Sequence, residues 1–158
     1  MTEGRLFNQR KVNRIFNHIP IKTLRWWGLK GLYTWVSEIS DKRGISREYE
    51  IANLYQIGIL ENLSSLDVSI SVIGLIMNAL GNNPSMDKIL FISKHPVKSR
   101  EITINLKKPF YMWHHLIIES EQINYLIVHY RERYKIATII IIDLAIIKEF
   151  VDSLIKEI

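Results

Sequence analysis

The sequence of 158 residues contains no cysteine. Disulfide bonds, thiol catalysis and cysteine-ligated metal sites are therefore excluded. The first residues, 1–5, are polar and lack the apolar stretch of a signal peptide. The longest apolar run, residues 136–147, is interrupted by Asp143 and is shorter than the roughly 20 residues that span a bilayer. These absences lead us to expect a cytoplasmic protein with no membrane partner.

The residue patterns that carry enzyme chemistry are also missing. The sequence has no Ser/His/Asp arrangement, no glycine-rich phosphate loop and no pair of catalytic carboxylates. His114 and His115 are adjacent, and adjacent residues on a strand point to opposite faces, so they cannot jointly chelate a metal ion. We therefore expect a protein that is not an enzyme and that holds no cofactor and no metal.

Positive charge is present in excess and is unevenly distributed. A hydrophobic fraction of 47% with 23% charged residues is typical of a folded globular protein of one domain or two small ones. The net charge is +5, and residues 1–50 hold ten Lys and Arg against five Asp and Glu, whereas the remaining residues hold eleven of each sign. This distribution is typical of a polyanion-binding module joined to a neutral domain. A solvated basic face without a partner is the alternative.

Residues 1–80 combine helical patterns with one hairpin pattern. Pro20 suits the first position of a helix, and Gly31 suits the position just after its end. Two β-prone segments flank a turn at residues 41–44, which predicts the wing of a winged helix-turn-helix. Ser69 is expected to cap a later helix. The predicted helices cover residues 8–16, 20–30, 48–59 and 70–80.

A cluster of helix breakers at residues 81–85 is the clearest boundary in the sequence. Beyond it the pattern alternates and is rich in Ile, Val and Tyr, which predicts an antiparallel sheet of about five strands with one C-terminal helix. The expected fold class is α+β, with a DNA-binding domain at 1–80, a linker at 81–85 and a dimerisation or effector domain at 86–158. The predicted strands are residues 89–92, 102–106, 116–118, 125–130 and 136–142.

The most informative segment is Thr23-Leu24-Arg25-Trp26-Trp27, which is followed by Gly31-Leu32. Consecutive helical residues point about 100° apart, so at least one of Arg25, Trp26 and Trp27 faces outward. With later features of matching spacing, this segment resembles the DNA-binding domain of the MerR family of bacterial transcription regulators over about residues 6–80. The later features are Gly44, Arg47, Tyr49, Asn53-Leu54, Ser69-Ile70 and Ile73.

The resemblance implies a winged helix-turn-helix that binds a pseudo-palindromic operator as a dimer and distorts promoter DNA for RNA polymerase. Three departures from the family pattern stand out. Gly28 replaces the usual Glu, Pro20 replaces a Ser-like cap, and the breakers at 81–85 interrupt the long helix that normally forms a dimer coiled coil. The metal or redox sensing by cysteine found in several members is impossible here.

The expected DNA contacts lie on the recognition helix and the wing. Lys22 and Arg25 lie three residues apart and should project together into the major groove. We expect one of Trp26 and Trp27 to pack under the wing and the other to lie against DNA or the domain rim. The wing arginines are expected on phosphate or in the minor groove, and the wing tyrosine is expected to donate to a phosphate and also to anchor the wing. The full predicted set is Lys22, Thr23, Arg25, Trp26, Arg43, Arg47 and Tyr49.

Two roles remain open for residues 86–158. Tyr111, Trp113 and His115 could line a ligand pocket for a small-molecule effector, although the same segment could instead form core or dimer packing. A homodimer is expected through this domain, with the apolar stripe of the last helix, residues 144–158, suited to a twofold contact. The alternative to a transcription regulator is a phage- or plasmid-type architectural or excisionase-like protein whose C-terminal domain recruits a protein partner. An enzyme or ligand carrier centred on residues 110–115 is the third hypothesis.

Overall fold

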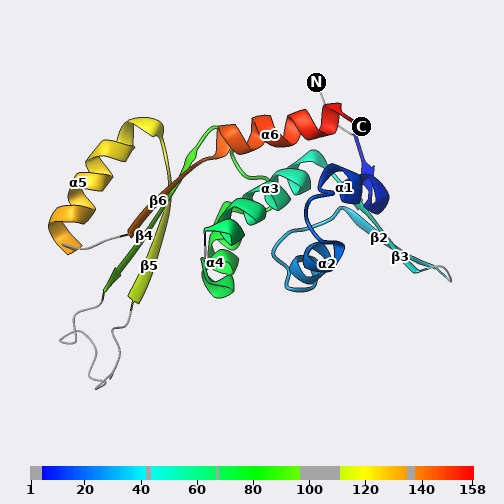
Figure 1. Ribbon diagram of the computed structural model, residues 1–158, viewed down its shortest axis with the longest axis horizontal. Helices are drawn as coiled ribbons and strands as arrows, with labels where there is room; N and C mark the ends of the chain where they lie inside the picture. The colour runs from blue at the N-terminus through cyan, green and yellow to red at the C-terminus, as the bar shows by residue number, and fades with distance from the viewer. Residues whose placement is uncertain (1–4, 42–43, 67, 97–110, 135–137) are drawn as a thin grey trace, which may run out of the picture. The chain divides into compact units, whose positions relative to one another are not determined.

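A computed structural model describes residues 5–41, 44–66, 68–96, 111–134 and 138–158. The described chain contains helices and two three-stranded antiparallel sheets, so the predicted α+β class is confirmed. The chain forms two compact units (Figure 1). Unit 1 comprises Met1–Met86 together with Ala145–Ile158, and unit 2 comprises Asp87–Leu144.

The first part of unit 1 is a pair of helices followed by a hairpin. The Asn8 side chain caps the first helix by accepting the Lys11 N–H at 3.0 Å. Pro20 is the N-cap of the second helix, one position before the expected one, and Gly31 follows its end with a φ of +66°. The elements are β1 (Phe7–Asn8), α1 (Gln9–Ile15), α2 (Ile21–Leu29), β2 (Ser37–Asp41) and β3 (Gly44–Tyr49), with sheet order β1-β3-β2.

The core of unit 1 is built around α3 (Ile51–Ser65). This helix is buried without interruption from its third residue to its tenth, so neighbours must cover it on nearly all sides. One neighbour is α4 (Ile70–Leu80), whose N-cap is Ser69 as predicted, although its hydroxyl makes no capping hydrogen bond. Another is α6 (Leu144–Lys156), which returns from the far end of the chain.

The C-terminal helix α6 was expected in the second domain and as a dimer contact, and the structure corrects this. Its apolar stripe of Ile147, Val151 and Ile155 is buried, and it meets α3 where Gly58 allows a close approach. A Cβ on Gly58 would lie 2.8 Å from a Val151 methyl and 3.0 Å from an Ile147 methyl. Tyr55 on α3 adds a hydrogen bond to Asp152 at 2.8 Å. The stripe therefore stabilises unit 1.

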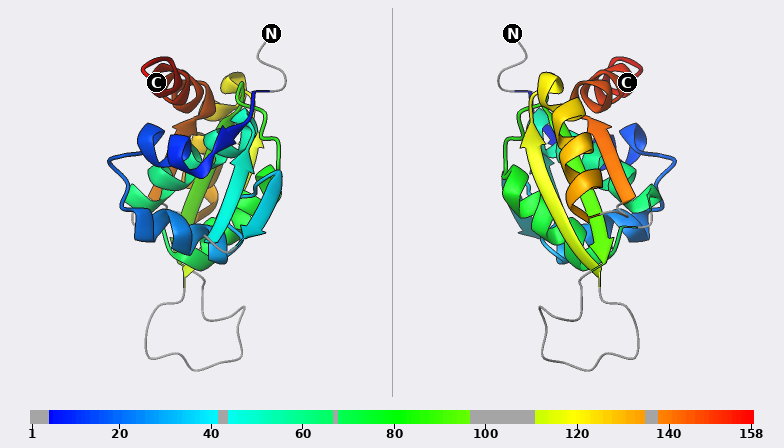
Figure 2. Two further views of the ribbon diagram at one scale, coloured as in Figure 1. Left: turned by 90° about the vertical axis from the view of Figure 1, so that its right-hand side faces the viewer. Right: turned by 90° about the vertical axis from the view of Figure 1, so that its left-hand side faces the viewer.

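The described residues of unit 2 form a three-stranded sheet with one long helix, α5, along one face, as the right-hand view of Figure 2 shows. The shared core contains Ile89, Phe91, Ile118 and Tyr130. Its elements are β4 (Ile89–Pro96), β5 (Tyr111–Ile118), a 3₁₀ turn η1 (Ser120–Gln122), α5 (Ile123–Tyr134) and β6 (Thr138–Asp143), in the order β5-β4-β6.

The strand predicted at residues 125–130 is wrong, because this segment forms part of α5. Its Ile, Val and Tyr content favours a strand, but Ile123, Leu126, Ile127 and Tyr130 follow the i, i+3, i+4, i+7 spacing of a helix face. All four pack into the core beside the sheet, and that burial outweighs the local strand preference. The strand predicted at residues 102–106 lies outside the described residues.

The domain boundary at residues 81–85 falls just before the observed division after Met86. No helix in the described ranges has the length and apolar character needed to cross a membrane.

Candidate nucleic-acid interface

Helix α2 has one buried and one exposed face. Leu24, Trp27 and Gly28 are buried. Because consecutive residues turn by about 100°, the opposite face is left to polar, cationic and some apolar side chains. The exposed residues of this helix and its C-cap are Ile21, Lys22, Arg25, Trp26, Leu29 and Lys30.

The two adjacent tryptophans are separated by this geometry. Trp27 is 4% exposed and belongs to the core, whereas Trp26 is 42% exposed. The ammonium of Lys30 lies 5.9 Å from the centre of the Trp26 ring, a cation–π contact one turn away. One tryptophan therefore points inward and the other outward, as the sequence predicts.

Lys22 and Thr23 lie beside Trp26 at a shallow groove of about 580 Å³. Lys22 is exposed and Thr23 is half-buried. The groove is lined by Lys22, Thr23, Trp26, Trp27, Ser64, Val68, Ile70 and Ile73. Its floor is apolar, while its α2 side carries the cation and the hydroxyl.

The segment that forms α1 and α2 is entirely free of negative charge. Between Arg5 and Ser37 the sequence has no Asp or Glu, but it contains the basic residues Arg5, Arg10, Lys11, Arg14, Lys22, Arg25 and Lys30. All seven are exposed. Among the described residues these cations form no ion pair, so they give this part of the surface a positive potential, which attracts a polyanion.

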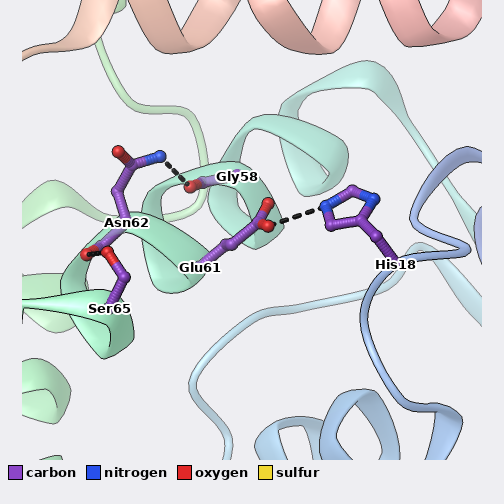
Figure 3. Close-up of polar contacts among 5 residues, drawn as sticks. All are labelled: His18, Gly58, Glu61, Asn62 and Ser65. Atoms are coloured by element: carbon purple, nitrogen blue, oxygen red, sulfur yellow. Dashed lines mark hydrogen bonds and ion pairs between the residues drawn. The ribbon is translucent and has the colours of Figure 1, made fainter.

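The turn between α1 and α2 is attached to α3 (Figure 3). His18 Nε2 lies 2.7 Å from Glu61 Oε1, and the His18 ring also lies 6.3 Å from that of Phe150 on α6. On the same stretch of α3, Asn62 donates to the Gly58 carbonyl at 3.0 Å. The contacts of His18 thus attach the turn that precedes α2 to α3 and α6.

In the β2–β3 hairpin, Arg47 makes contacts within its own unit. Its guanidinium lies 4.0 Å from the centre of the Trp35 ring, and its Nε donates to Glu38 at 2.8 Å. Only 15% of the side chain is exposed. Burial lowers the pKa of Arg47. The bond to Glu38 and the nearby acidic groups of Glu38, Tyr49 and Tyr33 together raise this pKa by more than burial lowers it, so the net shift is upward. A DNA contact by Arg47 stays a prediction.

Tyr49 does not have the surface position expected of a phosphate contact. Its side chain is fully buried, and its hydroxyl donates to Gln9 on α1. Burial raises the pKa of Tyr49, as it does that of neighbouring Tyr33, whose hydroxyl donates to the Leu24 carbonyl at 3.1 Å. The strand alternation turns Tyr49 inward. It therefore anchors the hairpin to the helix pair, and the predicted phosphate contact is corrected.

A buried amide network joins the elements behind this surface. Gln56 on α3 accepts the Thr34 N–H at 3.0 Å and donates to the Gly81 carbonyl at 3.0 Å. Asn53 donates to the Thr34 hydroxyl at 2.9 Å. The segment leading into the hairpin and the end of α4 are thus both attached to α3. The sequence identifies Asn53 only as part of the family pattern and predicts neither Gln56 nor this network, although two amides within a mostly apolar helix were a usable signal.

The remaining predicted residues belong to unit 2 or lie outside the described part of the chain. Arg43 lies outside the described residues. Tyr111, Trp113 and His115 are alternate residues of β5, and the Tyr111 side chain is also outside the described part. The Trp113 ring lies 5.1 Å from the Lys94 ammonium on the neighbouring strand. The ligand pocket therefore stays a prediction.

Comparison with protein-family models gives no match, and comparison with curated proteins gives none either. Within the described ranges, no group of three or more His, Asp or Glu side chains is arranged to hold a metal ion.

Proposed function

We propose that unit 1 binds double-stranded DNA as a transcription regulator of the MerR type. The observation that carries this proposal is the exposed face of α2, where Lys22, Arg25 and Lys30 surround Trp26 with no acidic residue on the helix. The order helix, helix, hairpin and helix in unit 1 supports the same assignment. Such a helix fits the major groove, where cations meet phosphates and base edges.

The geometry suggests a role for each part of unit 1. In this proposal α2 enters the major groove, with Arg25 on a guanine edge or a phosphate and Lys22 beside it. The exposed cations Arg10, Lys11 and Arg14 of α1 contact the flanking backbone. The contacts of Tyr49 and Arg47 hold the hairpin in place against the helix pair.

Unit 2 is proposed to join two copies of the chain. Several large hydrophobic side chains of unit 2 are exposed and could be covered by a second copy, namely Leu116, Ile117, Tyr125, Val128 and Ile141. A second copy would also supply the second recognition helix that a symmetric operator with two half-sites requires. Analytical ultracentrifugation of the full chain at micromolar concentration should show a dimer. A monomer would overturn this part of the proposal.

The DNA proposal is tested with the full-length chain and a labelled duplex selected from a random pool. Fluorescence anisotropy between about 50 and 200 mM salt should show affinity falling steeply, by a log–log slope of about −0.9 for each phosphate contacted. Arg25→Ala should weaken binding by about 1–3 kcal/mol while leaving the folded state intact, because the side chain is exposed.

The matched control is Arg131→Ala, which removes an equally exposed arginine from α5 of unit 2. It changes the net charge by the same amount and should leave the affinity unchanged within twofold, about 0.4 kcal/mol. Salt-independent binding, or equal losses for the two variants, would overturn the assignment of α2 as the DNA-reading helix.

A further inference from the structure

The exposed face of α2 carries apolar side chains among its cations. Leu29 is 78% exposed, which makes it the most exposed large hydrophobic residue in the described part of the chain. Trp26 and Ile21 are exposed on the same short helix. Single exposed hydrophobic residues are common on protein surfaces, but three on nine residues of one helix form a cluster.

The cluster and the cations alternate along the helix. Lys22, Trp26 and Leu29 follow each other at spacings of four and three residues, which places them in one row directly opposite the buried stripe. Arg25 lies one turn before Leu29, so its guanidinium and the Leu29 side chain are neighbours on the helix surface. The row of side chains opposite the core therefore contains both cationic and apolar groups.

Within a major groove, these two chemistries have different partners. Cations meet phosphates and the acceptor atoms of guanine, whereas the 5-methyl group of thymine is the apolar group that a base pair presents there. A protein partner for this face would have to be both apolar and acidic. Duplex DNA is favoured because all seven basic residues between Arg5 and Ser37 are exposed and this segment contains no acidic residue.

We infer that Leu29 contacts a thymine 5-methyl group in the major groove and is a specificity-determining residue of α2. The inference rests on the proposed DNA-binding function and deepens it, because it states which base the helix prefers beside the Arg25 contact. The preferred site then contains a thymine whose methyl group, and not its hydrogen-bonding atoms, is recognised.

The test replaces thymidine by deoxyuridine, one position at a time, in the selected duplex. This change removes a single methyl group and keeps every acceptor and donor of the base. The full-length protein should lose about fourfold in affinity at one thymine, as expected for one buried methyl group. Because only the DNA is changed, the result does not depend on the folding of a variant.

Leu29→Ala completes the test. It should bind the thymine duplex about as weakly as the original protein binds the deoxyuridine duplex, and it should no longer distinguish the two. Leu75→Ala is the matched control, since Leu75 is an exposed leucine on α4 at 62%. It should retain both the affinity and the discrimination.

The possible failures are distinguishable. If the full-length chain selects no duplex and shows no salt-dependent binding, the proposed function fails and the inference fails with it. If binding is salt-dependent but no deoxyuridine position weakens it, the inference alone is overturned. Discrimination that persists undiminished in Leu29→Ala assigns the methyl contact to another residue and also overturns it.

Discussion

The two units bury their hydrophobic residues in different ways. Unit 1 surrounds one central helix, α3, with elements from both ends of the chain. Unit 2 packs one helix on one face of a small sheet, and all its strands come from a single stretch of sequence. The comparison shows that the unit with the basic surface depends on distant residues for its core. Unit 2 is, in chain order, an insertion within it.

The largest effect on stability is expected when α6 is removed from unit 1. Two shortened chains test this, one that lacks unit 2 but keeps α6 and one that lacks both. The Leu144 N–H donates to the Lys88 carbonyl at 3.1 Å, so the two ends of unit 2 are adjacent. A variant in which a short Gly-Ser linker replaces residues 89–143 should therefore fold and bind DNA. A chain ending at residue 86 lacks α6 and should be largely unfolded.

Circular dichroism during thermal unfolding distinguishes these two shortened chains. The linked variant should show one cooperative transition, and the chain ending at residue 86 should show none. The linked variant should also be monomeric and bind a two-half-site duplex more weakly, since avidity commonly contributes about 10²–10⁴-fold. Equal stability of both chains would mean that α6 contributes nothing to unit 1.

A single buried charge in α6 tests the same packing in the full chain. Val151 is fully buried against α3, and Val151→Asp should lower the free energy of unfolding of unit 1 by about 3 kcal/mol or more. Denaturant unfolding followed by tryptophan fluorescence, in a Trp113→Phe background, reports on this unit, because the other three tryptophans, Trp26, Trp27 and Trp35, lie in it. Ser153→Asp, at an exposed position on the same helix, is the control and should cost under about 0.5 kcal/mol.

The close approach of α3 and α6 is tested by two matched glycine substitutions. Gly58→Ala would place its Cβ within 3.0 Å of both Val151 and Ile147, so it should destabilise unit 1 by about 1–3 kcal/mol. Gly74→Ala, on α4, meets only Leu32 at 3.7 Å and should be stabilising by about 0.5–1 kcal/mol through helix propensity. Thermal melts in which both variants shift in the same direction would contradict the packing described.

The smallest effect is expected at the pair that holds the turn between α1 and α2. His18 and Glu61 are both partly exposed, so His18→Ala should cost no more than about 1 kcal/mol in unfolding free energy. The effect on DNA affinity should be comparably small, because the buried residues Leu24 and Trp27 also hold α2 against the core. A loss of affinity as large as that of Arg25→Ala would instead make the pair a principal positioning contact.

Local signals were sufficient for the boundaries of α1, α2 and α4, but not for α3, which spans Ile51–Ser65 and not the predicted residues 48–59. Gly31 ends α2 because a positive φ is inexpensive for glycine, and the breakers at residues 81–85 end α4. The inward Trp27 and outward Trp26 follow from the helical repeat alone. The exposure of the basic residues follows from the cost of burying unpaired charge.

Local signals were insufficient where two patterns competed. Residues 125–130 have the composition of a strand but the spacing of a helix face. Packing on Phe91 and its neighbours selects the helix between these two. A tyrosine such as Tyr49 can donate its hydroxyl to a phosphate or pack its ring in the core, and its residue type does not favour either. Its hydroxyl partner, Gln9, is 40 residues away, so the sequence near Tyr49 contains no sign of it.

By itself the sequence determined the α+β class, the boundaries of α1, α2 and α4 to within one residue and the location of the positive charge, because these depend on interactions within a few residues. Only the tertiary structure decided that α6 belongs with the N-terminal helices. Its apolar stripe is compatible with any apolar partner, and the choice of α3 depends on the space left by Gly58 and on Tyr55, whose partner Asp152 is 97 residues away. The physical reason is that hydrophobic burial is not directional: it requires a partner surface, and shape complementarity between distant segments selects which one.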